Sequence, residues 1–259
     1  LRFHEPNCEF RRYCMSHQPS HASHPRTPPR PGRVFPPLFL LLGAVSGLWV
    51  LGARSWFATW HGFPNTPLTT LFFLAAAATA SGSVPSRYRW SVVAGLGFSA
   101  LGDLFLMLPK DHFVAGLSSF LAAHLCYLWA LTMDHRLAGR WPPFALWGVV
   151  GLALIAWLWP AVPSPLRLPV LFYTVALLGM AAQAASRAQA VRSPAAVLAA
   201  AGAALFVVSD AVLAIQRFRQ PFEGGRFLVL GTYFAAQAGI ALSVVLFPPP
   251  PSQAGPAED

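Results

Sequence analysis

Two aspartates surrounded by apolar residues are the first candidates for chemistry. Asp103 lies in "LGDLFL" and Asp210 lies in "VSDAVL", and each sits within a long apolar segment that holds no other formal charge. A carboxylate at membrane depth costs roughly 2.5–3.5 kcal/mol even on the most lenient scale, so such residues usually face a polar cavity inside the protein. Each aspartate is therefore suited to proton transfer. The alternative is a neutral carboxyl group that only hydrogen-bonds a neighbouring helix.

The two aspartates have similar surroundings. "GDLFL" at 102–106 and "SDAVL" at 209–213 share a small residue before Asp and a Leu three residues after it. Downstream, "FLAAH" at 120–124 resembles "YFAAQ" at 233–237. These offsets predict two related halves of four helices each, with the same topology and with the polar site at their interface. A chance likeness between short stretches is the alternative.

Further polar residues are expected to join the aspartates. Asp103 and Asp210 lie about six residues before the ends of their segments, and both segments run toward the same membrane face. At 1.5 Å per residue, each carboxylate is expected roughly 9 Å below that face. The residues expected in one pocket with them, as groups that orient substrate or water, are His124, Tyr127, Tyr173, Ser209, Tyr233 and Gln237. Alternatively, the histidine is a hydrogen-bonded packing residue, and the tyrosines belong to interfacial belts.

The elements that must position these residues are membrane helices. The chain of 259 residues is 55% hydrophobic and only 10% charged, whereas about 25% charged residues are typical of soluble domains. A helix crosses the hydrocarbon core with about 20 apolar residues. We therefore predict an all-α polytopic membrane protein with eight transmembrane helices, of which the second is the shortest. The segments are 34–53, 64–81, 90–108, 113–133, 142–160, 168–186, 194–216 and 227–247.

The polar ends of the chain flank this transmembrane domain at 34–247. Residues 1–33 are rich in Pro, Ser, His and Arg and are predicted to be a disordered tail, within which Met15 is a candidate for the true start. Residues 248–259 are predicted to be a disordered Pro-rich tail. The three cysteines form no CxxC pattern and no disulfide framework.

Basic residues give a formal net charge of +9. They lie in tails and short loops, where they act as membrane topology signals, so we predict no nucleic-acid partner. Their distribution, with Arg187 counted among the loop cations, mildly favours both termini in the cytoplasm. The Ala, Pro and Arg bias suggests the inner membrane of a bacterium. The oligomeric state stays open.

Four stretches resemble one known family when they are taken in order. "FSALGDLFLML", "FVAGLSSFLAAHLCYLWAL", "GAALFVVSDAVLA" and "TYFAAQAGIALS" resemble the YhhN family of eight-helix membrane proteins, whose animal members are lysoplasmalogenases. The resemblance covers about 85–247 and includes both aspartates. It implies hydrolysis of the vinyl ether bond of a lysoplasmalogen, a lysophospholipid, by water. No metal, nucleotide or organic cofactor is required. "TYF" stands where "TYY" is expected, which leaves Tyr233 intact.

The residue types make chemical sense of this reaction. Vinyl ethers hydrolyse through protonation at carbon, which forms an oxocarbenium ion that water captures. A buried carboxylic acid supplies the proton, and an ionised partner stabilises the cation and activates water. Asp103 and Asp210 are expected to share these two roles in an order that the sequence leaves open. Lys110, Arg217 and Arg219 are candidates to receive the substrate phosphate. A proton-coupled transporter that uses the same aspartates is the rival function.

Overall fold

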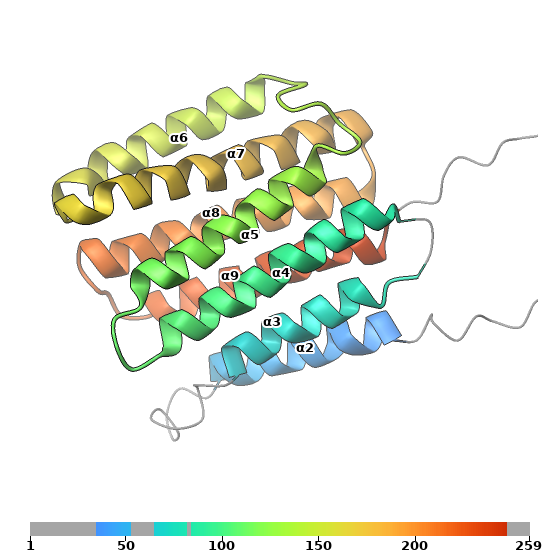
Figure 1. Ribbon diagram of the computed structural model, residues 1–259, viewed down its shortest axis with the longest axis horizontal. Coiled ribbons are helices and arrows are strands. Elements are labelled where there is room, and N and C mark those ends of the chain that lie inside the picture. Colours follow the sequence, from blue (N-terminus) through green and yellow to red (C-terminus); the bar gives the residue numbers. More distant parts are fainter. Residues whose placement is uncertain (1–34, 53–64, 82–83, 248–259) are drawn as a thin grey trace, which may run out of the picture. The chain divides into compact units, whose positions relative to one another are not determined.

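A computed structural model describes residues 35–52, 65–81 and 84–247, which belong to one compact unit. The predicted tails at 1–33 and 248–259 lie outside the described residues. The described part is helical and contains no strand, which confirms the all-α prediction (Figure 1). The α-helices are α2 (Phe35–Gly52), α3 (Asn65–Ala78), α4 (Ser86–Met107), α5 (Phe113–Leu131), α6 (Pro142–Leu158), α7 (Arg167–Val191), α8 (Pro194–Phe218) and α9 (Gly225–Val245).

Seven of the helices in the described ranges are long and apolar enough to cross a membrane, so the chain is an integral membrane protein. The exception is α3, which has 14 residues. At 1.5 Å per residue it is roughly 21 Å long, which is shorter than the hydrocarbon core of about 30 Å. The prediction of eight transmembrane helices is therefore not confirmed at α3.

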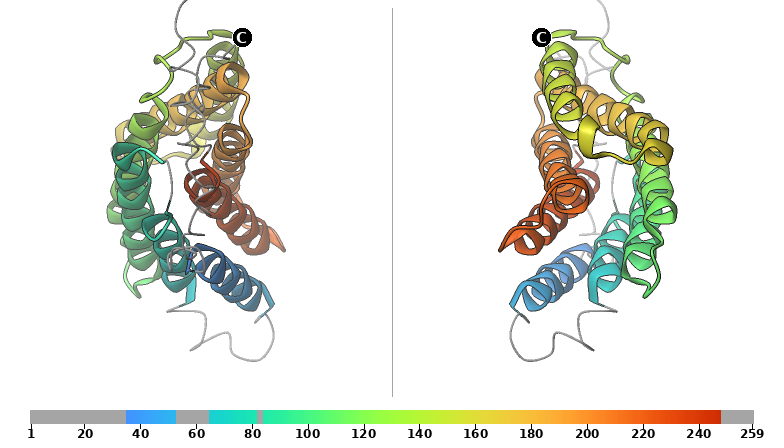
Figure 2. Two further views of the ribbon diagram at one scale, coloured as in Figure 1. Left: turned by 90° about the vertical axis from the view of Figure 1, so that its right-hand side faces the viewer. Right: turned by 90° about the vertical axis from the view of Figure 1, so that its left-hand side faces the viewer.

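The helices close into a ring around the buried core. Helix α4 packs antiparallel on α5, and α8 on α9. Helix α7, which contacts both α5 and α8, joins these two pairs on one side, and the contact of α4 with α9 joins them on the other. Figure 2 shows the two pairs facing each other, with α2 and α3 beside α9 and α4. Two glycines allow the backbones of α8 and α9 to approach closely. A Cβ atom at Gly202 would lie 2.8 Å from the carbonyl oxygen of Ala236, and one at Gly239 would lie 3.0 Å from that of Leu198.

Helix α7 continues past its predicted end and buries a cation. Arg187 lies within α7 and is 1% exposed, and both of its bonds to the Asp134 carboxylate measure 2.6 Å. Its guanidinium also stacks on the Tyr88 ring, with 5.2 Å to the ring centre. Counting Arg187 as a loop cation was therefore wrong, because it holds α7 to the segment that follows α5. The cytoplasmic placement of the termini remains a prediction.

Candidate active site

Helix α4 carries Asp103 into the core, where hydroxyl groups from two other helices hold it. Its side chain is almost fully buried, at 5% exposure. The Oδ2 atom accepts hydrogen bonds from Thr70 Oγ1 of α3 at 2.7 Å and from the Tyr233 hydroxyl of α9 at 2.8 Å. The preceding Gly102 lets α5 approach, because a Cβ atom there would lie 2.6 Å from the Phe120 ring. This arrangement fixes one carboxylate oxygen and leaves Oδ1 without a described hydrogen bond.

Helix α8 carries Asp210, which is held from α7 and α5. The Tyr173 hydroxyl donates to Asp210 Oδ2 at 2.5 Å. His124 Nε2 lies 3.0 Å from the Tyr173 oxygen and 3.5 Å from Asp210 Oδ2. The imidazole is completely buried and meets the Phe206 ring edge-on, with 4.7 Å between ring centres. Asp210 is therefore the carboxyl group that lies beside an imidazole, and its side chain is 12% exposed.

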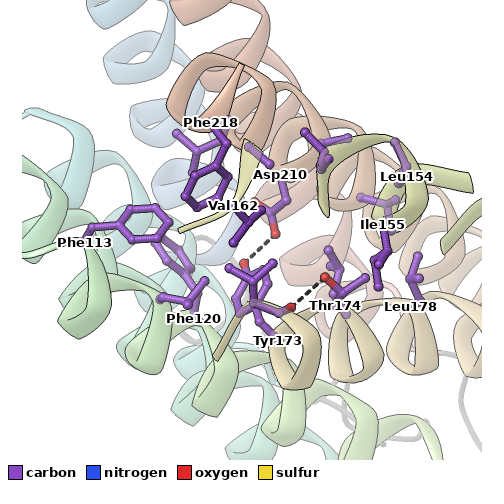
Figure 3. Close-up of a pocket in the computed structure, with 18 of the residues that line it drawn as sticks. Phe113, Phe120, Leu154, Ile155, Val162, Tyr173, Thr174, Leu178, Asp210 and Phe218 are labelled. Carbon is purple, nitrogen blue, oxygen red and sulfur yellow. Dashed lines mark hydrogen bonds between the residues drawn. The ribbon is translucent and has the colours of Figure 1, made fainter. Parts of the chain in front are cut away.

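Both aspartates border one cavity of about 400 Å³ for water-sized molecules. Its polar wall also includes Ser209, Gln216 and Arg226. Asp210 borders a second pocket as well, which is almost entirely apolar and lies among α5, α6, α7 and α8 (Figure 3). A single carboxylate thus lies between a partly polar space and an almost entirely apolar one.

The contacts of the two aspartates are reciprocal between the predicted halves. Asp103 on α4 is bonded from α3 in its own half and from α9 in the other half. Asp210 on α8 is bonded from α7 in its own half and contacted from α5 in the other half. This exchange is the pattern expected of a site at a repeat interface. The repeat itself stays a prediction.

Two of the expected pocket residues, Tyr127 and Gln237, lie apart from the carboxylates, and a third, Ser209, is hydrogen-bonded elsewhere. Tyr127 donates to Gln237 Oε1 at 3.0 Å and lies 3.3 Å from Ser99 Oγ, and neither Tyr127 nor Gln237 borders the cavity. These bonds join α4, α5 and α9 beside the site. Ser209 borders the cavity, but its hydroxyl donates to the Val229 carbonyl at 3.0 Å.

The three cations expected to receive a phosphate have other surroundings. Arg217 binds Asp111 at 2.5 Å, and this hydrogen bond lowers the pKa of the exposed Asp111 carboxyl. Arg219 donates to the carbonyl of Trp157. Neither these arginines nor Lys110 borders the cavity. The geometry therefore does not support them as phosphate ligands of this site.

Two functional candidates escaped the sequence reasoning. Thr70 lies in the short helix α3, and the only signal was a group of three threonines near the start of a mostly apolar segment. Arg226 is the second residue of α9 and borders the cavity that holds both aspartates. In the sequence, Arg226 could have been noticed as a cation next to the segment that carries Tyr233. Among the described residues, no cluster of three or more His, Cys, Asp or Glu could hold a metal ion.

Comparison with known proteins gives consistent results. A lysoplasmalogenase of Sus scrofa is 29% identical over 215 residues, which cover 82% of this chain and 87% of that protein. A lysoplasmalogenase of Bos taurus is 35% identical over 180 residues, covering 68% and 72%. One of Mycobacterium bovis is 35% identical over 171 residues, covering 63% of each chain. No solved structure matches. The YhhN family model matches residues 64–244, and the chain therefore belongs to the YhhN family.

Proposed function

We propose that this protein is a membrane-embedded hydrolase that cleaves the vinyl ether bond of lysoplasmalogens. Several relatives that cover most of the chain are named lysoplasmalogenases. The observation that carries the proposal is the pair Asp103 and Asp210, which border one cavity while Asp210 also borders an apolar pocket. The reaction needs an acid, a base, water and room for a hydrocarbon chain, and this site offers the residues and spaces for each.

We assign the acid to Asp103 and the base to Asp210. Asp103 is buried among neutral hydroxyl donors that bond only Oδ2, so Oδ1 is the oxygen that can carry a proton into the cavity. Asp210 is more exposed and lies beside the His124 imidazole. Burial without contact with solvent favours a neutral carboxylic acid, whereas contact with solvent favours a carboxylate.

With these roles, every proton that one group gives up in the proposed reaction is accepted by another. Asp103 gives its proton to the vinyl carbon that is not bonded to oxygen, and the double-bond electrons form the new C–H bond. The adjacent carbon becomes an oxocarbenium ion, which the Asp210 carboxylate stabilises while it takes a proton from the attacking water. The resulting hemiacetal loses its hydroxyl proton to Asp103, and the glycerol oxygen leaves with the proton from Asp210. A fatty aldehyde and a glycerophospho-alcohol are released, and both carboxyl groups return to their starting states.

The remaining polar groups have positioning roles in this scheme. Tyr173 and His124 orient Asp210, and Thr70 and Tyr233 orient Asp103. A hydroxyl bonded to a carboxylate stabilises its charge more than it stabilises the neutral acid. These donors therefore favour the charge that develops on Asp103 as its proton leaves.

The test is aldehyde release from lysoplasmenylethanolamine by purified protein in detergent, with the saturated ether analogue as the control. We expect aldehyde from the vinyl ether alone. Asp103→Asn and Asp210→Asn should each abolish release without affecting membrane insertion, and His124→Ala should reduce release less. Near wild-type rates in both Asn variants would refute the two-aspartate mechanism. No aldehyde from folded protein, together with proton flux in liposomes, would instead support the transporter.

A further inference from the structure

The apolar pocket beside Asp210 has walls of the kind that contact a hydrocarbon chain. Its walls are mainly Leu, Ile, Val and Phe side chains from α5, α6, α7 and α8 (Figure 3). The two hydroxyl groups in the wall are already bonded: Thr174 donates to the Val170 carbonyl at 2.8 Å, and Tyr173 donates to Asp210. Because these groups are satisfied within the protein, the pocket offers apolar contact rather than new hydrogen bonds.

The polar cavity on the other side of Asp210 carries one cation. Arg226 is the single Lys or Arg side chain in its wall within the described ranges. Neighbouring cations of the same membrane face are engaged elsewhere, since Arg217 binds Asp111 and Arg219 binds the Trp157 carbonyl. A guanidinium group matches a phosphate with two parallel hydrogen bonds, which makes Arg226 the candidate anchor for a phosphate group.

The loop before α9 holds Arg226 at the cavity wall. The Gln216 side chain accepts from the Phe222 backbone N–H at 2.9 Å and donates to the Phe222 carbonyl at 3.4 Å. The same amide packs on Gly225, where an added Cβ atom would collide with it. Gly225 is thus held against α8. This contact fixes the backbone position of the neighbouring Arg226.

We propose that the two spaces form one bipartite site for a single-chain phospholipid. The hydrocarbon chain occupies the apolar pocket, the phosphate binds Arg226, and the ether linkage lies between them beside the aspartates. This inference rests on the proposed function for the identity of the lipid. A lysophospholipid carries its ether oxygen at the junction of chain and glycerol, three carbon atoms from the phosphate oxygen. Occupation of both spaces therefore brings the ether linkage to Asp210, which borders both.

The test measures binding rather than turnover. Wild-type protein in detergent is titrated with the saturated alkyl-ether lysophosphoethanolamine, which lacks the cleavable bond, and with the alkylglycerol, which lacks the phosphate. Loss of a charge-assisted bidentate contact should weaken binding of the phospholipid to Arg226→Gln by about 10- to 100-fold, with no change for the alkylglycerol. Arg226→Lys should restore part of the affinity. Lys110→Gln, which removes an exposed cation outside both spaces, is the matched control and should bind like wild type.

The chain-binding half of the site has its own variant. Ala211 borders the apolar pocket, so Ala211→Leu should weaken binding of both lipids and shift the preference toward shorter chains. Ala201→Leu places the same side chain at an exposed position of the same helix and should change neither. Equal chain-length preference in Ala211→Leu and wild type would overturn the chain assignment.

Three outcomes separate the possibilities. An unchanged ratio of phospholipid to alkylglycerol affinity in Arg226→Gln overturns the phosphate assignment, even if the wild type releases aldehyde. The predicted binding pattern without aldehyde release supports the lipid site and rejects the proposed reaction. Inorganic phosphate should give no saturable binding in the concentration range where the phospholipid saturates. If it instead binds as strongly as the phospholipid, and this binding depends on Arg226, the ligand of the site is a free anion and the lipid assignment is overturned.

Discussion

Replacement of Tyr233 by Phe tests whether charge develops on Asp103 during the slow step. The Tyr233 hydroxyl donates to Asp103 Oδ2 at 2.8 Å, and the change removes this donor while the ring stays in its packing with Phe120, Phe206 and Phe234. A hydrogen bond to a charged group contributes about 1.5–3 kcal/mol, against about 0.5–1.5 kcal/mol for a neutral one. The difference of about 1 kcal/mol corresponds to roughly a fivefold lower kcat.

A second donor to the same oxygen sharpens this prediction. Thr70→Val removes the bond of 2.7 Å to Asp103 Oδ2, and a similar loss of kcat is expected. The oxygen atoms of Thr70 and Tyr233 also lie 3.2 Å apart, so the two changes act on one network and the double variant should deviate from the product of the single effects.

The assay is steady-state aldehyde release, with kcat and KM determined separately. Loss of an interaction that strengthens only in the transition state lowers kcat and leaves KM unchanged. Tyr88→Phe is the control. Tyr88 is also a buried tyrosine with a hydrogen-bonded hydroxyl group, which lies 2.8 Å from Ser243 Oγ, but it does not border the cavity. An unchanged kcat in Tyr233→Phe, or an equal loss in Tyr88→Phe, would refute the assignment of Asp103 as the proton donor.

Three further changes test the packing. Arg187→Ala removes the buried guanidinium that bonds the partly exposed Asp134 carboxylate and stacks on Tyr88, which we expect to lower the free energy of unfolding by about 1.5–3 kcal/mol, measured by thermal or denaturant unfolding in detergent. Gly95→Ala places a Cβ atom 2.3 Å from the Tyr127 ring and should lower the melting temperature. Arg217→Ala breaks an exposed ion pair and a cation–π contact with Phe113, so it should lower stability by about 1 kcal/mol or less and leave turnover unchanged.

Matched controls make these outcomes decisive. Arg192→Ala removes an exposed cation just after the same helix and should leave stability unchanged. Gly179 meets no atom within 4 Å at its Cβ position, so Gly179→Ala should be neutral or stabilising in helix α7. Equal losses from Gly179→Ala and Gly95→Ala would show that the close contact with Tyr127 does not limit the packing.

The all-α membrane architecture could be predicted from the long apolar stretches of the sequence, because a spanning helix needs a minimum number of apolar residues whatever its neighbours are. One predicted span stays unconfirmed, and one cation was misplaced. The segment 64–81 is apolar enough to suggest a span, yet α3 ends at Ala78. Arg187 was counted among the loop cations because the predicted segment ended at residue 186. Its burial is explained by the Asp134 carboxylate on a different segment.

The aspartates themselves could be found in the sequence, since an isolated carboxyl group in an apolar helix is costly and thus conspicuous. Their partners were only partly visible. Tyr173 and Tyr233 bond the carboxylates, whereas Tyr127 and Gln237 bond each other away from the cavity. Helical spacing tells which residues share a face. It does not tell toward which neighbour that face turns, because a membrane helix is apolar on nearly all sides.

By itself, the sequence of this protein determined its membrane character, its helical class and the two carboxyl groups at the candidate site. Only the tertiary structure showed that Thr70 donates to Asp103. It also showed that the cation bordering the cavity is Arg226, and not Lys110 or the arginines at the end of α8. The physical reason is that the cost of burying a charge is a property of one residue and its segment. The partner that offsets this cost is set by helix rotation and close packing, which depend on several segments at once.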